Sequence, residues 1–538
     1  MEIQVKGHSG CQIDIVSENR QLYVYKSTRD PKYLQRLVLQ AMKQKQASLV
    51  EYQHIRIPTI FEIQKDEKQT VVKMQYVYSK NFVEFFEQAG FEQIDYFIGA
   101  LKYFIEYEIG QSRLQSVSAE IFYNKFTDVK SKCESNPLFI GDDKIESILT
   151  LSEQIFNNLK DLNIPVGLCH GDLTFSNILF NGNNYYLIDF LDNFIETPLQ
   201  DIVKIRQDTQ YRWSQLMYKK KYDDVRLHII LDKIDNEIDN YFSNKYQWYN
   251  DYYQIMQLMN ILRILPYAHE DKVIKFLKIA LWDILESLIK KKNICRCNEE
   301  TESEAKQSIK HSLIVPVAAM KDEYENNLPY LFGLNRDGIT ICVKSIMGLN
   351  LEQFDNIYFT ILKNHDDRFF ISESLRLQFK RLGITNAKVV VLEESTQDQV
   401  ETIYQTIMKE KIDGSIFIKD ADCYFKASIT NSNAVAIFPI EELDILTPKD
   451  KSYVAIDDMY YLTNIIEKKL VGHYISAGGY EIMNVEIFKK YYNRLRKYGK
   501  LYLSHIIYAM LLEKRSFQPI VVEDYKDWGT RNDFNRYE

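Results

Sequence analysis

The pattern of apolar and polar positions divides the chain into two parts with different periodicities. In the first part, alternation predicts four short strands, at 12–16, 22–26, 60–63 and 70–77. Apolar residues at three-to-four spacing predict a helix over 31–48, and the same spacing prevails over 82–160. Two short apolar runs lie between 166 and 188, and helical patterns then continue to 292. The first part is therefore predicted to be an α+β unit.

The second part alternates between strands and helices. Buried-type apolar runs predict four strands, at 312–318, 354–362, 388–392 and 414–419. A helical pattern over 397–409 lies between two of them, and such alternation is typical of an α/β domain with a largely parallel sheet. The charged, polar stretch 290–310 separates the two parts. We therefore expect a domain over 1–300, a linker over 301–311 and a domain over 312–538.

Composition narrows the classes of function. The 538 residues carry 67 basic and 75 acidic side chains, a net charge of −8, so no basic excess suggests a nucleic-acid partner. Hydrophobic residues make up 46% of the chain, which excludes global disorder. The seven cysteines are scattered and form no C-x-x-C pair, which argues against a zinc ribbon or a disulfide framework.

The same pattern bears on where the protein works. No run approaches the roughly 18 apolar residues of a membrane span, and the first residues lack the pattern of a signal peptide. We therefore expect a cytoplasmic protein whose partners are small molecules and nucleotides. The sequence gives no prediction of the oligomeric state.

The residues with the clearest chemistry lie in two short runs, C-H-G-D-L-T-F-S-N-I-L-F at 169–180 and Y-L-I-D-F at 186–190. Transfer of a γ-phosphoryl group needs a carboxylate that orients and deprotonates the attacking hydroxyl, and it needs oxygen ligands for Mg²⁺. Asp172 is the candidate carboxylate, and Asn177 and Asp189 are the candidate metal ligands. Each of them alone is more often an ordinary turn residue, whereas the joint pattern between apolar strands is far more specific.

These runs follow the protein-kinase pattern H-x-D-L-x-x-x-N and D-F, with Gly171 where protein kinases carry arginine and Leu191 where they carry glycine. The His-Gly-Asp variant resembles the aminoglycoside phosphotransferase and choline kinase superfamily, which phosphorylates small molecules. The resemblance implies a bilobal protein-kinase-like fold that uses ATP and Mg²⁺. It also implies that Asp172 acts as the base, that His170 packs within the loop and that Asp201 supports the loop.

The N-terminal residues carry weaker signals of the same resemblance. In Gly7-His8-Ser9-Gly10, backbone N–H groups could cover the phosphates of ATP. Lys26 ends a predicted strand where the family has its phosphate-binding lysine, although an exposed strand-end lysine is the alternative. The helix over 31–48 carries no glutamate to pair with Lys26, so we expect Gln40 or Gln44 to orient it by hydrogen bonding.

Four segments of the second part follow one another in an order that is also found in a known enzyme family. The predicted strand 414–419 runs into Asp420-Ala421-Asp422. Next along the chain come Glu467-Lys468 and the small-residue run 476–480. Near the end lies Asp527-Trp528-Gly529-Thr530. This order resembles the sugar-phosphate nucleotidyltransferases, which have a GT-A-type, Rossmann-like sheet. The resemblance implies that Asp422 and Asp527 bind Mg²⁺ and that Lys468 meets the sugar phosphate. Either aspartate of the first turn alone would more often be a solvated turn residue.

One departure from this resemblance concerns phosphate binding. The family opens with a glycine-rich loop and an arginine, followed by a lysine beside proline. Here the equivalent run 316–323 contains no glycine, and Tyr330 follows Pro329 where the lysine is expected. Lys321 is the candidate to replace the arginine. Two hypotheses stay open, a divergent but active transferase or a nucleotide-sugar-binding module without the chemistry.

The sequence therefore predicts a bifunctional enzyme. The first domain would phosphorylate a hydroxyl of a sugar or an amino alcohol with ATP. The second would transfer a nucleotidyl group to the product from a second nucleoside triphosphate, CTP or UTP, and family analogy alone suggests a precursor of a surface polysaccharide. The alternative combines an active kinase with a non-catalytic nucleotide-sugar-binding module. A non-catalytic scaffold is disfavoured by Asp172, Asn177 and Asp189.

Overall fold

The structure is a computed structural model that describes residues 3–6, 11–291, 310–318, 328–334, 337–443 and 451–529. Gly7, Ser9, Gly10 and Lys321, which the sequence nominates for phosphate binding, lie outside these residues, as does most of the predicted linker. The chain divides into two compact units. The first comprises Met1–Glu87, Gln93–Tyr222 and Ile230–Glu300, and the second comprises Gln88–Glu92, Asp223–Ile229 and Thr301–Glu538.

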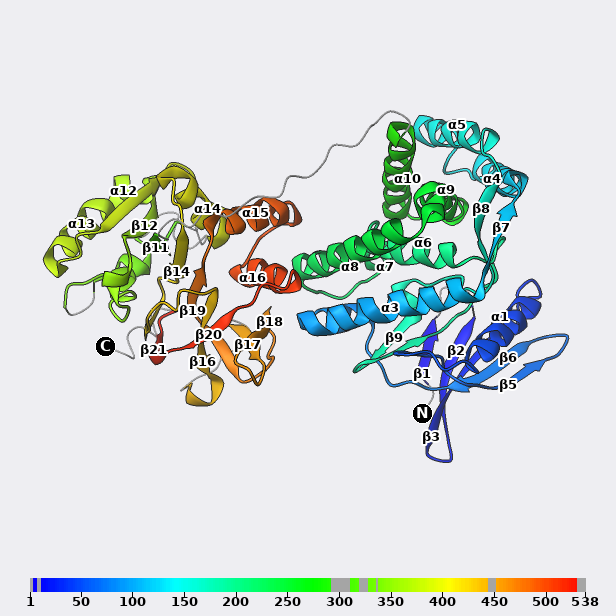
Figure 1. Ribbon diagram of the computed structural model, residues 1–538, viewed down its shortest axis with the longest axis horizontal. Helices are drawn as coiled ribbons and strands as arrows, with labels where there is room; N and C mark the ends of the chain where they lie inside the picture. The colour runs from blue at the N-terminus through cyan, green and yellow to red at the C-terminus, as the bar shows by residue number, and fades with distance from the viewer. Residues whose placement is uncertain are drawn as a thin grey trace. The chain divides into compact units, whose positions relative to one another are not determined.

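The first unit begins with a five-stranded antiparallel sheet (Figure 1). Its strands, in spatial order, are β1 (Ile3–Lys6), β2 (Gln12–Glu18), β3 (Gln21–Thr28), β6 (Thr70–Gln75) and β5 (Ile60–Lys65). Helix α1 (Leu34–Ala47) packs on β5 and β6 and buries Leu37 and Ala41 in a core with Ile60 and Val72. Strands β2, β3, β5 and β6 and helix α1 lie where the sequence pattern predicts them, whereas β1 is not indicated by the pattern. Lys26 sits on the central strand β3, opposite Val72.

Helices make up most of the rest of this unit. They are α2 (Phe82–Phe86), α3 (Phe91–Gln111), α4 (Ala119–Glu134), α5 (Asp143–Asn157), α6 (Pro198–Thr209), α7 (Trp213–Leu216), α8 (Asp224–Lys245), α9 (Gln247–Leu262) and α10 (Asp271–Lys291), of which α3 and α8 have their first residues in the second unit. One strand, β7 (Arg113–Val117), interrupts the stretch that the pattern predicts to be helical over 82–160. It pairs with β8 (Leu162–Val166), and this long-range pairing overrides the helical pattern.

The two short runs between 166 and 188 include a tight hairpin. Strands β9 (Ile178–Asn181) and β10 (Asn184–Leu187) pair antiparallel around Gly182, whose φ of +57° suits the turn. A single 3₁₀ turn, η1 (Phe175–Asn177), precedes β9, and β4 (Ile55–Arg56) pairs in parallel with β10. The hairpin therefore brings the ends of the two motif-bearing runs side by side.

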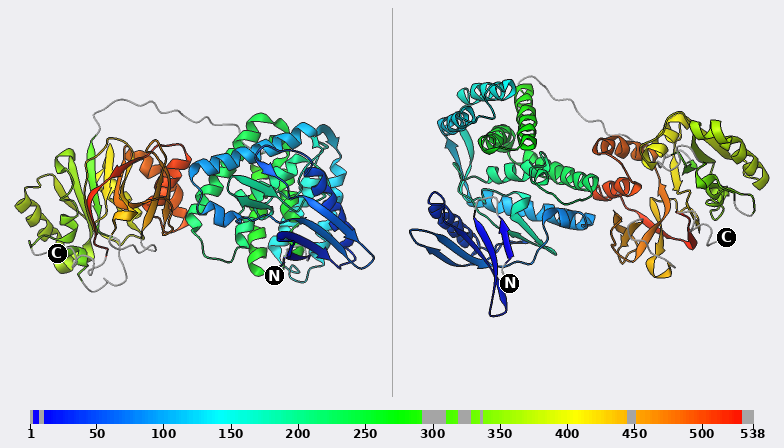
Figure 2. Two further views of the ribbon diagram at one scale, coloured as in Figure 1. Left: turned by 90° about the horizontal axis from the view of Figure 1, so that it is seen from below. Right: turned by 180° about the vertical axis from the view of Figure 1, so that it is seen from behind.

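The second unit is built on a nine-stranded sheet (Figure 2). Its main path is β13 (Ala387–Leu392), β12 (Asn356–Leu362), β11 (His311–Pro316), β14 (Ser415–Lys419), β19 (Tyr474–Ile482), β16 (Ala434–Pro439) and β20 (Gln518–Val521), with β17 (Ser452–Ile456) on β19 and β18 (Leu462–Glu467) on β17. The four predicted strands form the expected parallel part, because β11 pairs in parallel with β12 and β14, and β12 with β13. Strand β19 runs antiparallel to β14 and β16, which the sequence pattern does not indicate.

Helices pack along the parallel part of this sheet. Helix α13 (Ile371–Leu382) contacts β13, and α14 (Gln399–Glu410) contacts β11, β12 and β13. Further helices are α12 (Lys363–Phe369), α15 (Val485–Leu495) and α16 (Leu503–Leu512). Across the described parts of both units, no helix combines the length and the apolar character needed to cross a lipid bilayer.

The carboxyl end of β14 carries the acidic residues that the sequence singles out in this unit. The chain turns after Lys419 and enters β15 (Cys423–Lys426), which pairs antiparallel with β21 (Glu523–Asp527). In that register Cys423 lies opposite Asp527. Two segments far apart in the sequence therefore meet at the carboxyl end of a parallel strand, where α/β sheets commonly bind ligands.

Candidate active sites

Asp172 lies in a loop that hydrogen bonds hold in shape. Its carbonyl accepts from the Thr174 N–H at 2.7 Å and from Nδ2 of Asn177 at 2.8 Å. Nδ2 of Asn177 also donates to the carboxylate Oδ2 of Asp172 at 3.0 Å. The turn η1 makes this possible, because it reverses the chain and returns Asn177 to Asp172. The loop therefore presents a carboxylate and an amide side chain at the same place.

A cation from helix α6 accompanies Asp172. Nζ of Lys204 lies 3.0 Å from Oδ1 of Asp172, and the two side chains are 15% and 24% exposed. Burial alone would favour the neutral acid. The ammonium of Lys204, with a smaller contribution from the amide of Asn177, outweighs burial and holds the pKa of Asp172 below its ordinary value. Asp172 is therefore an ionised carboxylate at neutral pH.

Asp189 lies two residues after the end of β10 and adopts an unusual backbone conformation. Its φ is +62°, in the left-handed region that non-glycine residues rarely occupy. The N–H of Ile188 donates to the Asn177 carbonyl at 3.1 Å and joins the two loops. Nζ of Lys26 lies 2.7 Å from Oδ1 of Asp189. Burial opposes the charge of Lys26, but Asp189 overcomes it, so the pKa of Lys26 lies above its ordinary value.

The expected partners of Lys26 on helix α1 have other hydrogen bonds. Nε2 of Gln40 donates to the hydroxyl of Tyr33 at 3.1 Å, and Nε2 of Gln44 donates to the Pro58 carbonyl at 3.2 Å. Asp189 is the residue that orients Lys26 instead. The prediction that Gln40 or Gln44 does so is therefore wrong, because a carboxylate from the other motif reaches the ammonium directly.

His170 and Asp201 shape the backbone of the catalytic loop. Nδ1 of His170 accepts from the Asp172 N–H at 3.2 Å, which assigns the proton to Nε2, and Nε2 donates to the Ile188 carbonyl at 2.9 Å. Burial lowers the pKa of His170 to about 4, so its ring is neutral. The carboxyl group of Asp201 accepts the N–H groups of His170 and Gly171 at 2.5 and 2.7 Å. These contacts agree with the packing and supporting roles inferred for the two residues.

Helix α1 reaches the segment after β10 through Lys43. Nζ of Lys43 donates to the Leu191 carbonyl and to Oε2 of Glu196, both at 2.6 Å. Oε1 of Glu196 accepts from the Asn193 N–H, and Nδ2 of Asn193 donates to the Gly171 carbonyl, both at 2.8 Å. A continuous series of contacts therefore links α1 to the catalytic loop.

The donor atoms of the first unit suit Mg²⁺, which prefers oxygen ligands. Nδ2 of Asn177 makes the donations to Asp172, so its Oδ1 is the atom that can face a cation, and Asp189 adds a carboxylate. Within the described residues, no group of three or more His, Cys, Asp or Glu side chains is placed to hold a metal ion. Phosphate oxygens of a nucleotide would have to complete the coordination, as they commonly do for Mg²⁺.

In the second unit, Asp420, Asp422 and Asp527 gather at the end of β14. The N–H of Trp528 donates to the Asp422 carbonyl at 2.8 Å and continues the pairing of β15 with β21. Oδ1 of Asp420 accepts from Nε2 of Gln399 at 2.5 Å. Burial, followed by the neighbouring Asp422, raises the pKa of Asp420 to about 7. The repulsion of Asp420 by a neighbouring carboxylate would be relieved by a bound cation.

A half-buried lysine lies beside these carboxylates. Nζ of Lys451 forms an ion pair with Oδ2 of Asp527 and lies 3.3 Å from the hydroxyl of Tyr525. Burial opposes the charge of Lys451, but Asp527, assisted by Asp422, raises its pKa above the ordinary value. Lys451 is therefore a cation that pairs with Asp527 and lies within the electrostatic reach of Asp422.

The turn after β14 is closely packed on both sides. Nζ of the buried Lys419 donates to the carbonyls of Asp420 and Cys423 at 2.7 and 2.8 Å. Gly478 of β19 passes against the other side, where a Cβ would lie 2.7 Å from Oδ2 of Asp420 and 2.8 Å from Sγ of Cys423. Its φ of +81° also favours glycine. The small-residue run is thus needed for the close approach of β19.

Glu467 and Lys468 point to different partners. Oε1 of Glu467 accepts from the hydroxyls of Ser452 and Ser504 at 2.5 and 2.6 Å. Lys468 is exposed, has a φ of +60°, and its Nζ lies 3.2 Å from the hydroxyl of Tyr502. The structure therefore places Lys468 on the surface at the end of β18.

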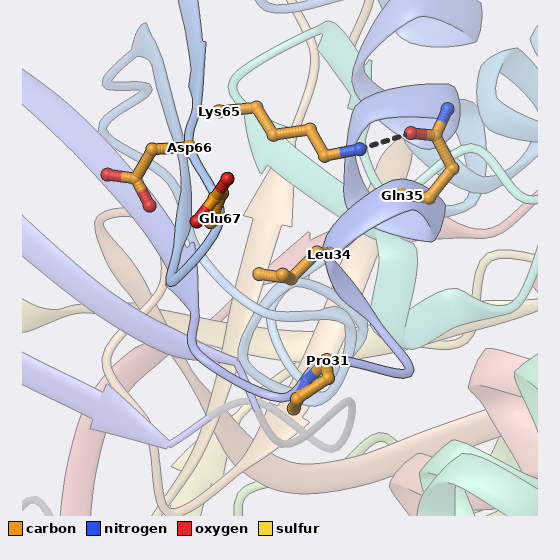
Figure 3. Close-up of a pocket in the computed structure, with 6 residues that line it drawn as sticks. All are labelled: Pro31, Leu34, Gln35, Lys65, Asp66 and Glu67. Atoms are coloured by element: carbon orange, nitrogen blue, oxygen red, sulfur yellow. Dashed lines mark hydrogen bonds between the residues drawn. The ribbon is translucent and has the colours of Figure 1, made fainter.

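A surface hollow of about 510 Å³ lies in the first unit between the start of α1 and the turn from β5 to β6 (Figure 3). Its lining residues are Pro31, Leu34, Gln35, Lys65, Asp66 and Glu67. Nζ of Lys65 donates to Oε1 of Gln35 at 2.5 Å across its rim. None of the lining residues is a predicted site residue, so the hollow is separate from the motifs.

The family comparison concerns the first unit. Residues 131–222 match the model described as the phosphotransferase enzyme family. The matched segment contains Asp172, Asn177 and Asp189, and it confirms the predicted phosphotransferase enzyme in this part of the chain. No curated protein matches the chain.

Solved structures of both predicted classes are similar to parts of the chain. A thermostable mutant of an aminoglycoside phosphotransferase is 10% identical, with a TM-score of 0.38, and the match covers 53% of this chain and 94% of that one. A nucleoside-diphosphate-sugar pyrophosphorylase from Vibrio cholerae is 15% identical, with a TM-score of 0.36 and coverage of 42% and 98%. An inositol-1-phosphate CTP transferase from T. maritima is 10% identical, with a TM-score of 0.34 and coverage of 42% and 92%.

Sequence reasoning missed the lysines that accompany the predicted carboxylates. Lys204, Lys43 and Lys451 lie outside every motif, and their partners are distant in the sequence. A signal existed for Lys204, because it lies three residues after Asp201 in a helical pattern and so shares a helix face with it. No comparable signal marks Lys43 or Lys451.

Proposed function

We propose that the first unit is a small-molecule kinase with a bilobal, protein-kinase-like fold, which phosphorylates a hydroxyl of a sugar or an amino alcohol with ATP. The observation that carries this proposal is the convergence of Asp172, Asn177 and Asp189 through hydrogen-bonded loops. The match of residues 131–222 to a phosphotransferase family supports it.

In the proposed reaction, Asp172 accepts the proton of the acceptor hydroxyl while the hydroxyl oxygen forms a bond to the γ-phosphorus. The bond from the γ-phosphorus to its bridging oxygen breaks, and ADP leaves with that electron pair. Asn177 and Asp189 would hold Mg²⁺, which neutralises phosphate charge when bound. Lys26 would then exchange Asp189 for phosphate oxygens of the nucleotide.

We further propose that the second unit is a Rossmann-like nucleotidyltransferase, which joins CTP or UTP to the phosphorylated product and releases pyrophosphate. Asp422 and Asp527 would hold Mg²⁺, and the neighbouring Lys451 supports the handling of an anionic substrate there. Lys468 would meet the sugar phosphate. The alternative is a nucleotide-sugar-binding module without chemistry, favoured by the absence of glycine from 316–323.

The two proposed activities form a sequence, because the product of a small-molecule kinase belongs to the substrate class of a nucleotidyltransferase. We infer domains over 1–300 and 312–538 joined by 301–311. The final product would be an activated precursor of a surface polysaccharide, made in the cytoplasm from small molecules and nucleotides.

A substrate screen of the full chain tests both activities. The protein is incubated with ATP, Mg²⁺ and a panel of sugars and amino alcohols, and phosphorylated products are detected by mass spectrometry. The products are then offered with CTP or UTP, and pyrophosphate is measured. Phosphorylation without pyrophosphate from any nucleotide would favour the binding module, whereas a protein that neither binds MgATP nor phosphorylates any compound would overturn the kinase proposal.

A further inference from the structure

Helix α6 presents one face to the catalytic loop. Asp201, Lys204 and Asp208 are spaced three and four residues apart, so their side chains leave the helix on the same side. The carboxyl group of Asp208 accepts the Phe175 N–H at 2.6 Å. Asp201 accepts two N–H groups earlier in the same loop. The two acidic residues therefore fix the loop backbone at both ends.

Lys204, between these two residues, contacts the loop at the side chain that reacts. Its Nζ lies 3.0 Å from Oδ1 of Asp172, while Nδ2 of Asn177 lies 3.0 Å from Oδ2. Both carboxylate oxygens are thus held, one from the helix and one from the loop. A carboxylate offers about four lone-pair positions, so about two are left for an acceptor hydroxyl.

We propose that Lys204 is a positioning residue for phosphoryl transfer, which holds Oδ1 of Asp172 so that the remaining lone pairs of the carboxylate face the acceptor hydroxyl. This inference rests on the proposed kinase function. Lys204 does not take the transferred proton, which passes from the hydroxyl to Asp172 as the new oxygen–phosphorus bond forms. Its effect is to keep that base oriented before the reaction.

The contacts around Asp172 make the role testable by kinetics. Lys204 holds Oδ1 of Asp172, and Asn177 holds Oδ2. Loss of Lys204 should therefore leave the carboxylate less well oriented, while the pair of Lys26 with Asp189 stays as it is. The expected result is a lower kcat with little change in KM for ATP.

The experiment uses the full chain and hydrolysis of MgATP to ADP and phosphate, with water in place of the unidentified acceptor. Lys204→Met removes the charge at similar length, and we expect kcat to fall by about 10²-fold, as for a misplaced catalytic group, with KM for ATP within about twofold. Lys204→Arg should restore part of kcat, because it retains a cation that can hold Oδ1 of Asp172.

Two controls separate this role from a general loss of structure. Lys220→Met removes another lysine–carboxylate pair of the same unit, with Glu84, in which Lys220 is 72% exposed, and it should leave kcat and KM for ATP unchanged. In an Asp172→Asn background, Lys204→Met should have little further effect, because the residue through which it acts is already altered.

The possible failures are distinguishable. A wild-type chain that neither binds nor hydrolyses MgATP would overturn the kinase function itself. An active wild type whose kcat is the same in Lys204→Met would overturn only the role of Lys204. Equal losses from Lys204→Met in the wild-type and Asp172→Asn backgrounds would do the same, since the two residues would then act independently.

Discussion

Nζ of Lys26 lies 2.7 Å from Oδ1 of Asp189, although the two residues are 163 positions apart in the sequence. The pair joins the central strand of the antiparallel sheet to the end of β10. Lys26 is 5% exposed, so its charge needs a partner, and a nearby carboxylate provides one. In the proposed kinase, this pair must open when a nucleotide brings phosphates to Lys26 and a cation to Asp189.

The first prediction concerns Asp189. Asp189→Ala should abolish Mg²⁺-dependent binding of a non-hydrolysable ATP analogue, because it removes a charged ligand of the cation. Calorimetric titration with and without Mg²⁺ measures this. Asp192→Ala, three residues further along and exposed, is the control and should bind as the wild type does. Undiminished Mg²⁺-dependent binding in Asp189→Ala would show that the metal ligand lies elsewhere.

Asp172 should affect the reaction rather than nucleotide binding. Asp172→Asn keeps the shape of the side chain but cannot accept a proton, so phosphoryl transfer should fall by roughly 10²–10⁴-fold while ATP binding stays nearly intact. Turnover and calorimetric affinity are measured on the same preparation. Asp143→Asn, on the exposed start of α5, serves as the matched control. Wild-type turnover of Asp172→Asn at saturating substrate would remove Asp172 from the role of base.

A comparison of Gly171 with Gly182 separates the effect of steric overlap from the effect of backbone strain. Gly171 and Gly182 both have positive φ values, +91° and +57°, so alanine is strained at either position. A Cβ at 171 would also overlap the Leu191 carbonyl and lie 2.7 Å from Nδ2 of Asn193, whereas a Cβ at 182 meets nothing within 4 Å. Gly182→Ala should cost about 1 kcal/mol of stability.

We therefore expect Gly171→Ala to be clearly more destabilising than Gly182→Ala and to lose most phosphoryl transfer, since the catalytic loop must move away from Leu191. Thermal unfolding and turnover of both variants provide the test. Equal effects of the two substitutions would mean that the close approach of Gly171 to Leu191 does not matter in solution.

The buried His170 should make the stability of the fold depend on pH. Burial lowers its pKa from 6.5 to about 4, so between these values the unfolded chain binds a proton that the folded chain does not. Unfolding therefore becomes easier as pH falls through 6.5, and by pH 5 the contribution reaches about 2 kcal/mol. His170→Asn removes this contribution, so the stability advantage of the wild type over the variant should shrink between pH 7.5 and pH 5.

Denaturant unfolding of the full chain at the two pH values measures that difference. His269→Asn, at an exposed position, should show the same difference from the wild type at both pH values. A stability gap between wild type and His170→Asn that stays constant with pH would indicate a protonated or accessible ring.

The motif residues of the first unit could be found from the sequence because the structure that unites them is local. The turn η1 and one hairpin suffice to bring Asp172, Asn177 and Asp189 together. Lys43 could not be found in this way, because it meets Leu191 and Glu196 148 and 153 residues away only after α1 packs. Charge complementarity across such a distance leaves no periodic trace in a sequence.

In the fold, too, local patterns could be predicted from the sequence, whereas long-range pairings could not. The parallel strands β11 to β14 were predictable, because each is a buried apolar run separated by helical or polar segments. The strand β7 was mistaken for helix, since only its pairing with β8 makes it extended. Strand β19 is buried along nearly its whole length, so its antiparallel direction cannot be read from alternation.

The last prediction concerns the second unit, where Asp422 and Asp527 are joined by the pairing of β15 with β21. If this unit transfers nucleotidyl groups, the two carboxylates must share one cation, because neither alone can neutralise a triphosphate and a phosphate nucleophile held together. Asp422→Asn and Asp527→Asn should each abolish pyrophosphate release, and the double variant should be no worse than either single one. Phosphorylation by the first unit should be unchanged in all three.

Asp524→Asn, exposed on the same strand, should retain pyrophosphate release. An active wild type that tolerates loss of Asp527 would refute the assignment of its carboxylate to the metal, and no pyrophosphate from the wild type with any nucleotide would indicate a binding module.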